Sequence, residues 1–154
     1  MMGLQQRTES LFYYFRLEDQ IPEGHLLRLI DRHVDLSFVR ERLKNLYSST
    51  GRPSIDPEVL LRLLLVGYLY GITSEQRLLE EVRMHLAYRW FTRLDFEPEI
   101  PDHSTFSKNR HGRFRQSGVF RDVFEEIVRR CMAVGLVEGQ NLAVDGTMVG
   151  ANAS

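Results

Sequence analysis

Apolar side chains recur every three or four residues along most of this chain, and this spacing constrains its fold more than any other feature. The pattern is clear in residues 25–34 and again in residues 117–137, where a stripe runs from Val119 to Cys131. A repeat near 3.6 residues is typical of amphipathic α-helices that bury one face. We therefore expect an all-α fold, a compact helical domain, for most of the chain.

The apolar period changes near the end of the sequence. After the turn-like residues 138–140, Leu142 and Val144 alternate with Ala143 and Asp145, which is the period of a strand. We expect a helical domain over 1–137, and at 138–154 a hinge followed by a first strand.

Helix boundaries are marked by capping residues. Asp56 precedes Pro57, a pairing that favours an N-cap followed by the first helical position. Asp102 or Ser104 is expected to cap a second helix. Gly71 and Gly135 follow apolar runs and are suited to helix C-termini.

Overall composition excludes several classes of protein. The net charge is −1, and a single cysteine, Cys131, rules out an internal disulfide. The apolar run 59–71 carries Arg62 and is shorter than the roughly 20 residues that a membrane span needs. We interpret this run as a buried core helix of a cytoplasmic protein.

One segment departs from the neutral balance of the chain. Residues 103–121 contain no acid and five cations, namely Lys108, Arg110, Arg113, Arg115 and Arg121. Hydroxyl and amide side chains lie between them, and Phe106 and Phe114 can anchor the segment to the core. These residue types are typical of a helix that contacts DNA phosphates, with a log–log salt slope of roughly −4. The alternative is a solvated face that acids elsewhere in the chain neutralise.

Two further patterns are weaker. Residues 71–91 have the outline of a helix-turn-helix, but their glutamates would face phosphates, so packing helices are the favoured interpretation. Asp145 follows an apolar strand, where metal sites are often built, yet an Asp-Gly pair is also typical of a plain turn.

Four stretches together resemble bacterial insertion-sequence transposases of the kind that begins with an InsH-type N-terminal domain. Residues 51–91 resemble the central block of that family, and "PDHSTFSKNR" at 101–110 resembles its Asp-His-Ser-Thr-Phe signature. The helix at 117–137 occupies the linker position. "LAVDGTMVGANAS" at 142–154 resembles the first strand of a catalytic domain with an RNase H-like fold.

The resemblance implies a chemistry. Such transposases cut and join DNA by Mg²⁺-dependent phosphoryl transfer with an Asp-Asp-Glu set, in which Asp145 matches the first acid and would be a metal ligand. No position of this sequence matches the second Asp or the Glu. We therefore expect this chain to bind no cofactor and to be catalytically inactive by itself. Three explanations for the missing acids stay open: a gene remnant, the first frame of a split gene, or a partial gene. A nuclease active as it stands is the remote alternative.

The resemblance also implies that the partner is DNA at the ends of the insertion sequence. The process would be DNA transposition, a form of DNA recombination, and it would take place in the nucleoid. The residues expected to contact DNA are Lys108, Arg110, Arg113, Arg115 and, more weakly, Arg89. The rival interpretation is a helical module for protein–protein interaction that dimerises or joins a full-length transposase. An apolar 59–70 helix that is not fully buried would favour this rival.

Overall fold

The computed structural model describes residues 14–48, 50, 54–96, 100–133 and 135, and within these ranges every regular element is helical. In chain order the elements are η1 (Glu18–Gln20), α1 (Leu26–His33), α2 (Phe38–Leu43), η2 (Lys44–Leu46), α3 (Pro57–Leu69), α4 (Glu75–Met84), α5 (Leu86–Phe91), α6 (His103–Asn109), η3 (Arg110–Phe114), α7 (Arg115–Ser117) and α8 (Val119–Ala133). The expected all-α class is thus confirmed for the described part of the chain.

Local capping explains where the main helices begin. The Asp56 carboxylate accepts a hydrogen bond from the Glu58 backbone N–H at 2.8 Å, and Pro57 opens α3. Asp102, rather than Ser104, caps α6, where its Oδ1 accepts from the Ser104 N–H at 2.8 Å. Each carboxylate satisfies an amide that has no partner inside the helix.

Glycines with positive φ set the other boundaries. Gly71 (φ +65°) follows α3, and Gly135 (φ +72°) follows α8. Gly118, at φ +69°, separates α7 from α8, so the long helix begins at Val119. A residue without Cβ adopts this left-handed conformation at little steric cost.

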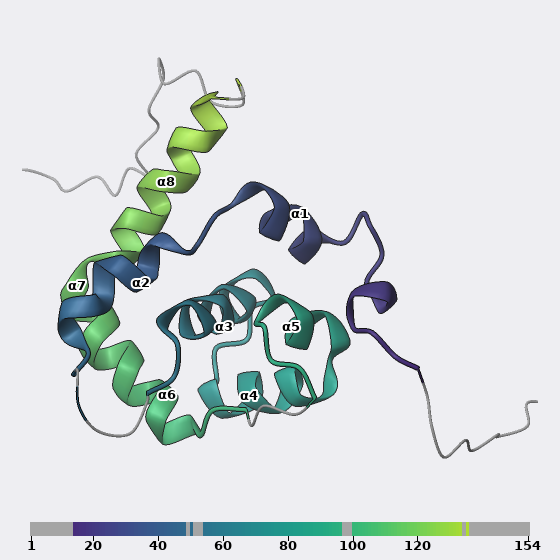
Figure 1. Cartoon of the computed structure of the whole chain (residues 1–154), viewed down its shortest axis with the longest axis horizontal. Helices are drawn as coiled ribbons and strands as arrows, with labels where there is room; N and C mark the ends of the chain where they lie inside the picture. The colour runs from purple at the N-terminus through teal and green to yellow at the C-terminus, as the bar shows by residue number, and fades with distance from the viewer. Residues whose placement is uncertain (1–13, 49, 51–53, 97–99, 134, 136–154) are drawn as a thin grey trace, which may run out of the picture.

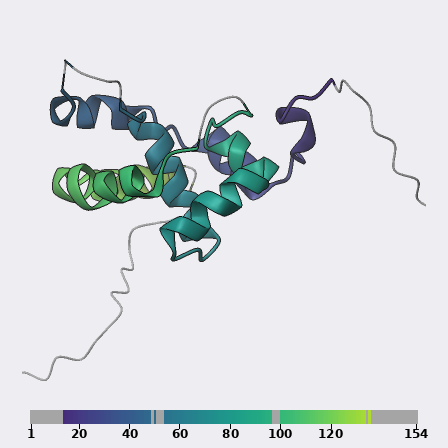
Figure 2. The same ribbon diagram turned by 90° about the horizontal axis from the view of Figure 1, so that it is seen from below.

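Helix α3 lies at the centre of the molecule. Helix α2 packs on one end of α3, and α5 packs on the other end. Helix α4 follows α3 in the chain and also contacts it, and α1 packs across α5 (Figure 1). Seen from below, α2 and α8 run side by side, away from α4 and α5 (Figure 2). The shared core includes the fully buried Leu27, Val39, Leu63, Val66, Phe91 and Phe114.

The core also holds one charged group from the apolar run. Arg62 is only 4% exposed. Its guanidinium donates to Glu58 Oε1 at 2.8 Å, to Asp31 Oδ1 at 2.6 Å and to the Phe91 carbonyl at 3.0 Å. A buried charge is tolerated when its hydrogen bonds are made in this way, and this set joins α1, α3 and α5.

The end of the chain is beyond this description. The expected strand of an RNase H-like domain lies in residues 138–154, outside the described residues, and the boundary between 137 and 138 stays a prediction. Among the described residues, every helix is too short or too polar to cross a bilayer.

Candidate nucleic-acid interface

The cationic segment found in the sequence folds into one continuous helical run, from α6 through η3 to α7. Phe106 and Phe114 are 1% and 0% exposed, which confirms the expectation that they anchor the run to the core. The middle part, η3, is a π-helical turn. Such widened turns inside α-helices are frequent at functional sites.

Arg113 is half-buried and lies against η2. Its Nε donates to the Leu46 carbonyl at 3.1 Å, and its Nη1 donates to Asn109 Oδ1 at 2.6 Å. The guanidinium also stacks 4.2 Å from the centre of the Tyr47 ring. Burial raises the pKa of the Tyr47 hydroxyl, and the Arg113 charge partly opposes that rise. Arg113 therefore ties η3 to η2.

Two more cations of the segment are neutralised by glutamates. Arg110 lies 2.9 Å from Glu75 Oε1, on the first turn of α4, and His111 lies 3.8 Å from the same oxygen. Arg121 pairs with Glu125 one helical turn further along α8, at 2.9 Å. The Arg121–Glu125 pair, with side chains 83% and 60% exposed, contributes between nothing and about 1 kcal/mol, so a phosphate can compete for Arg121. Glu75 is only 15% exposed, so solvent screens its pair with Arg110 less.

Lys108 and Arg115 differ from the other cations of the segment. Both side chains are exposed, and neither makes a salt bridge with any described residue. His103, Ser104 and His111 are also exposed on this run, whereas Phe106, Asn109 and Phe114 are buried. The run therefore presents to solvent two cations that no described acid pairs with, and three further polar side chains.

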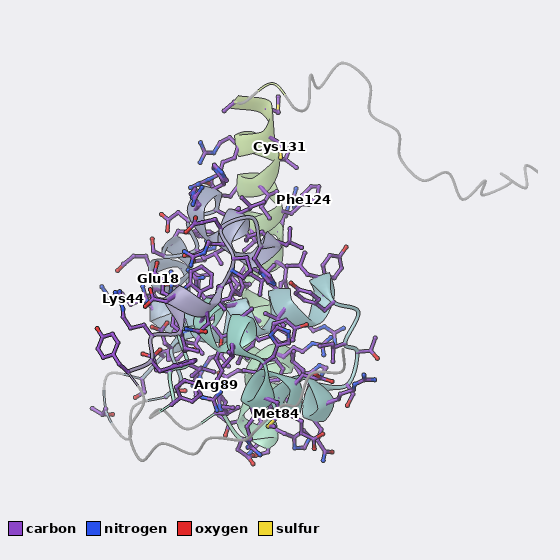
Figure 3. The ribbon with its side chains drawn as sticks, turned by 90° about the vertical axis from the view of Figure 1, so that its right-hand side faces the viewer. Glu18, Lys44, Met84, Arg89, Phe124 and Cys131 are labelled. Carbon is purple, nitrogen blue, oxygen red and sulfur yellow. The ribbon has the colours of Figure 1, made fainter. Side chains whose placement is uncertain are left out.

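Arg89 lies in the body of the molecule (Figure 3) and is 8% exposed. Its Nε donates to the Arg83 carbonyl at 2.9 Å, and its Nη1 donates to the Asp95 carbonyl at 2.7 Å. The guanidinium lies 5.2 Å from the centre of the Phe96 ring. These contacts hold together the chain on both sides of α5, and they leave Arg89 unavailable as a surface cation.

The surroundings of Arg89 bear on the helix-turn-helix alternative. Ala87, Tyr88 and Phe91 are buried on the same short helix, α5. A helix buried on most of its surface cannot enter a DNA groove, since a recognition helix needs a free face. The interpretation of residues 71–91 as packing helices is supported.

The sequence analysis did not identify the partners of Arg110 and Arg113. Asn109 precedes Arg113 by four residues, a spacing at which helical side chains meet, so that contact had a local signal. Glu75 is 35 residues from Arg110, and the Leu46 carbonyl is 67 residues from Arg113. No local pattern reveals contacts at such separations.

Asp145 lies outside the described residues, so its assignment as the first acid of a metal-binding set stays a prediction. Within the described residues, no group of three or more His, Cys, Asp or Glu side chains is placed to hold a metal ion. The residues described here therefore do not supply the ligand set that the resemblance implies.

The comparisons with known proteins give one match. A family model described as a transposase domain (DUF772) matches residues 15–112, from the start of the described region into the π-helical turn. No curated protein and no solved structure matches the chain. Because the matched region covers well over half of the 154 residues, the chain belongs to the DUF772 transposase-domain family.

Proposed function

We propose that this chain binds duplex DNA through the exposed side of the α6–η3–α7 run, with Lys108 and Arg115 as the primary phosphate contacts. The observation that carries the proposal is a pair of exposed cations that form no salt bridge with any residue the structure describes. They lie beside Ser104 and His111, on a helix anchored by buried phenylalanines. Cations and neutral donors on a rigid helix are what phosphate contacts use. Membership of a transposase-domain family supports DNA as the partner.

The other cations divide according to their contacts. Arg110 joins the proposed surface as a third contact, because its side chain is 43% exposed and its guanidinium has further donors besides the one that contacts Glu75. Arg113 is left out because its donors are already directed to a carbonyl and an amide. Arg89 is left out because it is buried. The proposed contacts are therefore with DNA phosphates, and no residue is assigned to contact a base.

This division changes the expected salt dependence. Each neutralised phosphate contributes about −0.9 to the slope of log K against log salt, so two contacts give about −1.8 and three give about −2.7. Both values are shallower than the slope expected when every cation of the segment meets a phosphate.

The test measures the affinity for a fluorescently labelled duplex at several salt concentrations. The variant Lys108→Ala/Arg115→Ala is compared with Arg32→Ala/Arg129→Ala, which also removes two cations. Arg32 and Arg129 are exposed and pair with Glu23 and Glu126. Arg32 lies on α1 and Arg129 lies near the C-terminal end of α8. We expect the first variant to flatten the slope by about 1.8 and the control to leave it nearly unchanged.

Two outcomes contradict the proposal. Equal losses in both variants would show that binding follows net charge alone and not this surface. Binding by the wild type that does not respond to salt would exclude phosphate contacts as its source.

A further inference from the structure

Glu75 is an acid that the fold places against the cationic α6–η3–α7 run. It is the first residue of α4, and α4 packs against α6 (Figure 1). Its Oε1 accepts a hydrogen bond from Arg110 Nη1 at 2.9 Å and lies 3.8 Å from His111 Nε2. One carboxylate oxygen is therefore shared by two neighbouring side chains of the π-helical turn.

The position of the Glu75 carboxylate favours a charged group that stays in place. The side chain is only 15% exposed. It belongs to the first turn of α4, where the Ser74 hydroxyl accepts from the Arg77 N–H at 3.3 Å and caps the helix. The positive end of the helix dipole stabilises an anion there. Glu75 is thus held beside Arg110 by its own helix as well as by the ion pair.

The apolar groove beside Glu75 corrects one expectation from the sequence. This groove of about 590 Å³ lies between α3, the start of α4, α6 and α8, and Glu75 and Arg110 are among its lining residues. Leu64 and Leu65 of α3 also line it and are only half-buried, so the apolar 59–70 run is not a fully buried core helix. This exposure is what the protein-interaction alternative predicts, but no contact of a described residue indicates a partner. The apolar wall does reduce the screening of the Glu75 charge by solvent.

Arg110 meets Glu75 with one of its donors, and the rest of its guanidinium is available. Because the Arg110 side chain is 43% exposed, its other N–H groups can contact a phosphate while Nη1 stays on Glu75. The charge of Arg110 is then shared between a carboxylate and a phosphate. A shared cation attracts the phosphate less and releases fewer counterions than a free cation does.

We infer that Glu75 limits the affinity of this chain for DNA by neutralising Arg110. The inference rests on the proposed phosphate contacts of Lys108 and Arg115, and it assigns the residue that restrains the third contact. The wild type behaves as a surface with two full phosphate contacts. Removal of the Glu75 charge makes Arg110 the third, which steepens the slope of log K against log salt from about −1.8 to about −2.7.

The test measures the affinity of Glu75→Gln for the labelled duplex at about pH 8, where imidazole side chains are neutral. Glutamine keeps the size of the side chain and an acceptor for Arg110, but it carries no charge. We expect binding to tighten by about three- to fivefold at low salt, and the slope to steepen by about 0.9. Glu23→Gln is the matched control, because Glu23 pairs with Arg32 at the same distance of 2.9 Å, at the start of α1.

The double variant Glu75→Gln/Arg110→Ala shows whether Arg110 carries the effect, since it should bind no more tightly than Arg110→Ala alone. Circular dichroism shows that each variant is folded. A folded Glu75→Gln with the affinity and slope of the wild type would overturn the inference. So would an equal gain in Glu23→Gln, or a gain in the double variant over Arg110→Ala. If the DNA-binding proposal itself is wrong, Lys108→Ala/Arg115→Ala also leaves the slope unchanged, and the inference falls with it.

Discussion

Replacing Arg62 with methionine should destabilise this protein by about 3 kcal/mol, because the change leaves two largely buried carboxylates with one cation fewer. The Arg62 side chain is 5% exposed, and those of its partners Glu58 and Asp31 are 9% and 17% exposed. With exposed fractions this small, solvent screens the charges of these three side chains only weakly. Methionine keeps much of the volume of the side chain and makes no ionic contact.

The magnitude follows from the contacts that remain. Removing one partner of a buried ion pair typically costs about 3–5 kcal/mol. Here Glu58 keeps Arg40 at 2.7 Å, and Asp31 keeps Arg93 at 2.8 Å, so neither carboxylate is left without a cation. The lower end of the range therefore applies. For a chain of this size, about 3 kcal/mol lowers Tm by roughly 6–12 °C.

Urea unfolding monitored by circular dichroism measures this change. Arg40→Met is the control, since the Arg40 side chain is 51% exposed and its pairs should contribute no more than about 1 kcal/mol. The double variant Glu58→Gln/Arg62→Met should be no less stable than Arg62→Met, because one buried carboxylate has been neutralised. Equal stability losses for Arg62→Met and Arg40→Met would refute the reasoning that burial sets the magnitude.

Two further predictions concern helix boundaries. Ser104 donates hydrogen bonds to the Asp102 carboxylate, and these bonds hold the pKa of Asp102 below its usual range. The ionised cap of α6 therefore contributes its full stabilisation above the ordinary pKa of about 3.9. That stabilisation is lost as pH falls through the lowered pKa of the folded state. The stability difference between wild type and Asp102→Asn, measured by urea unfolding, should therefore shrink as the solution is acidified below pH 4, and a difference that stays constant would contradict this. Gly71→Ala should destabilise the protein by about 1 kcal/mol because φ there is +65°, whereas Gly24→Ala, at a glycine without positive φ or close neighbours, should be neutral or slightly stabilising in thermal denaturation. Equal effects of the two alanines would contradict the assigned strain.

Local sequence determined the helices and several of their ends. Asp56 is predictable as a cap, and Gly71 and Gly135 as stops, because each acts on backbone groups within one helical turn. For α6 the sequence leaves Asp102 and Ser104 as alternatives, and the structure selects Asp102. The burial of Phe106 and Phe114 was also predictable, since large apolar side chains in a charged segment have few other places to pack.

Only the tertiary structure decided which cations can meet a partner. The sequence gathers five positive charges in residues 103–121, but it does not say that Glu75 neutralises Arg110 or that the Leu46 carbonyl holds Arg113. The burial of Arg89 is likewise set by the carbonyls of Arg83 and Asp95, which the turns around α5 bring together. The physical reason is the separation of the interacting residues along the chain. A helix cap is formed by residues close together in the sequence. Whether a surface cation is neutralised depends on which residues, distant in the sequence, the fold places beside it.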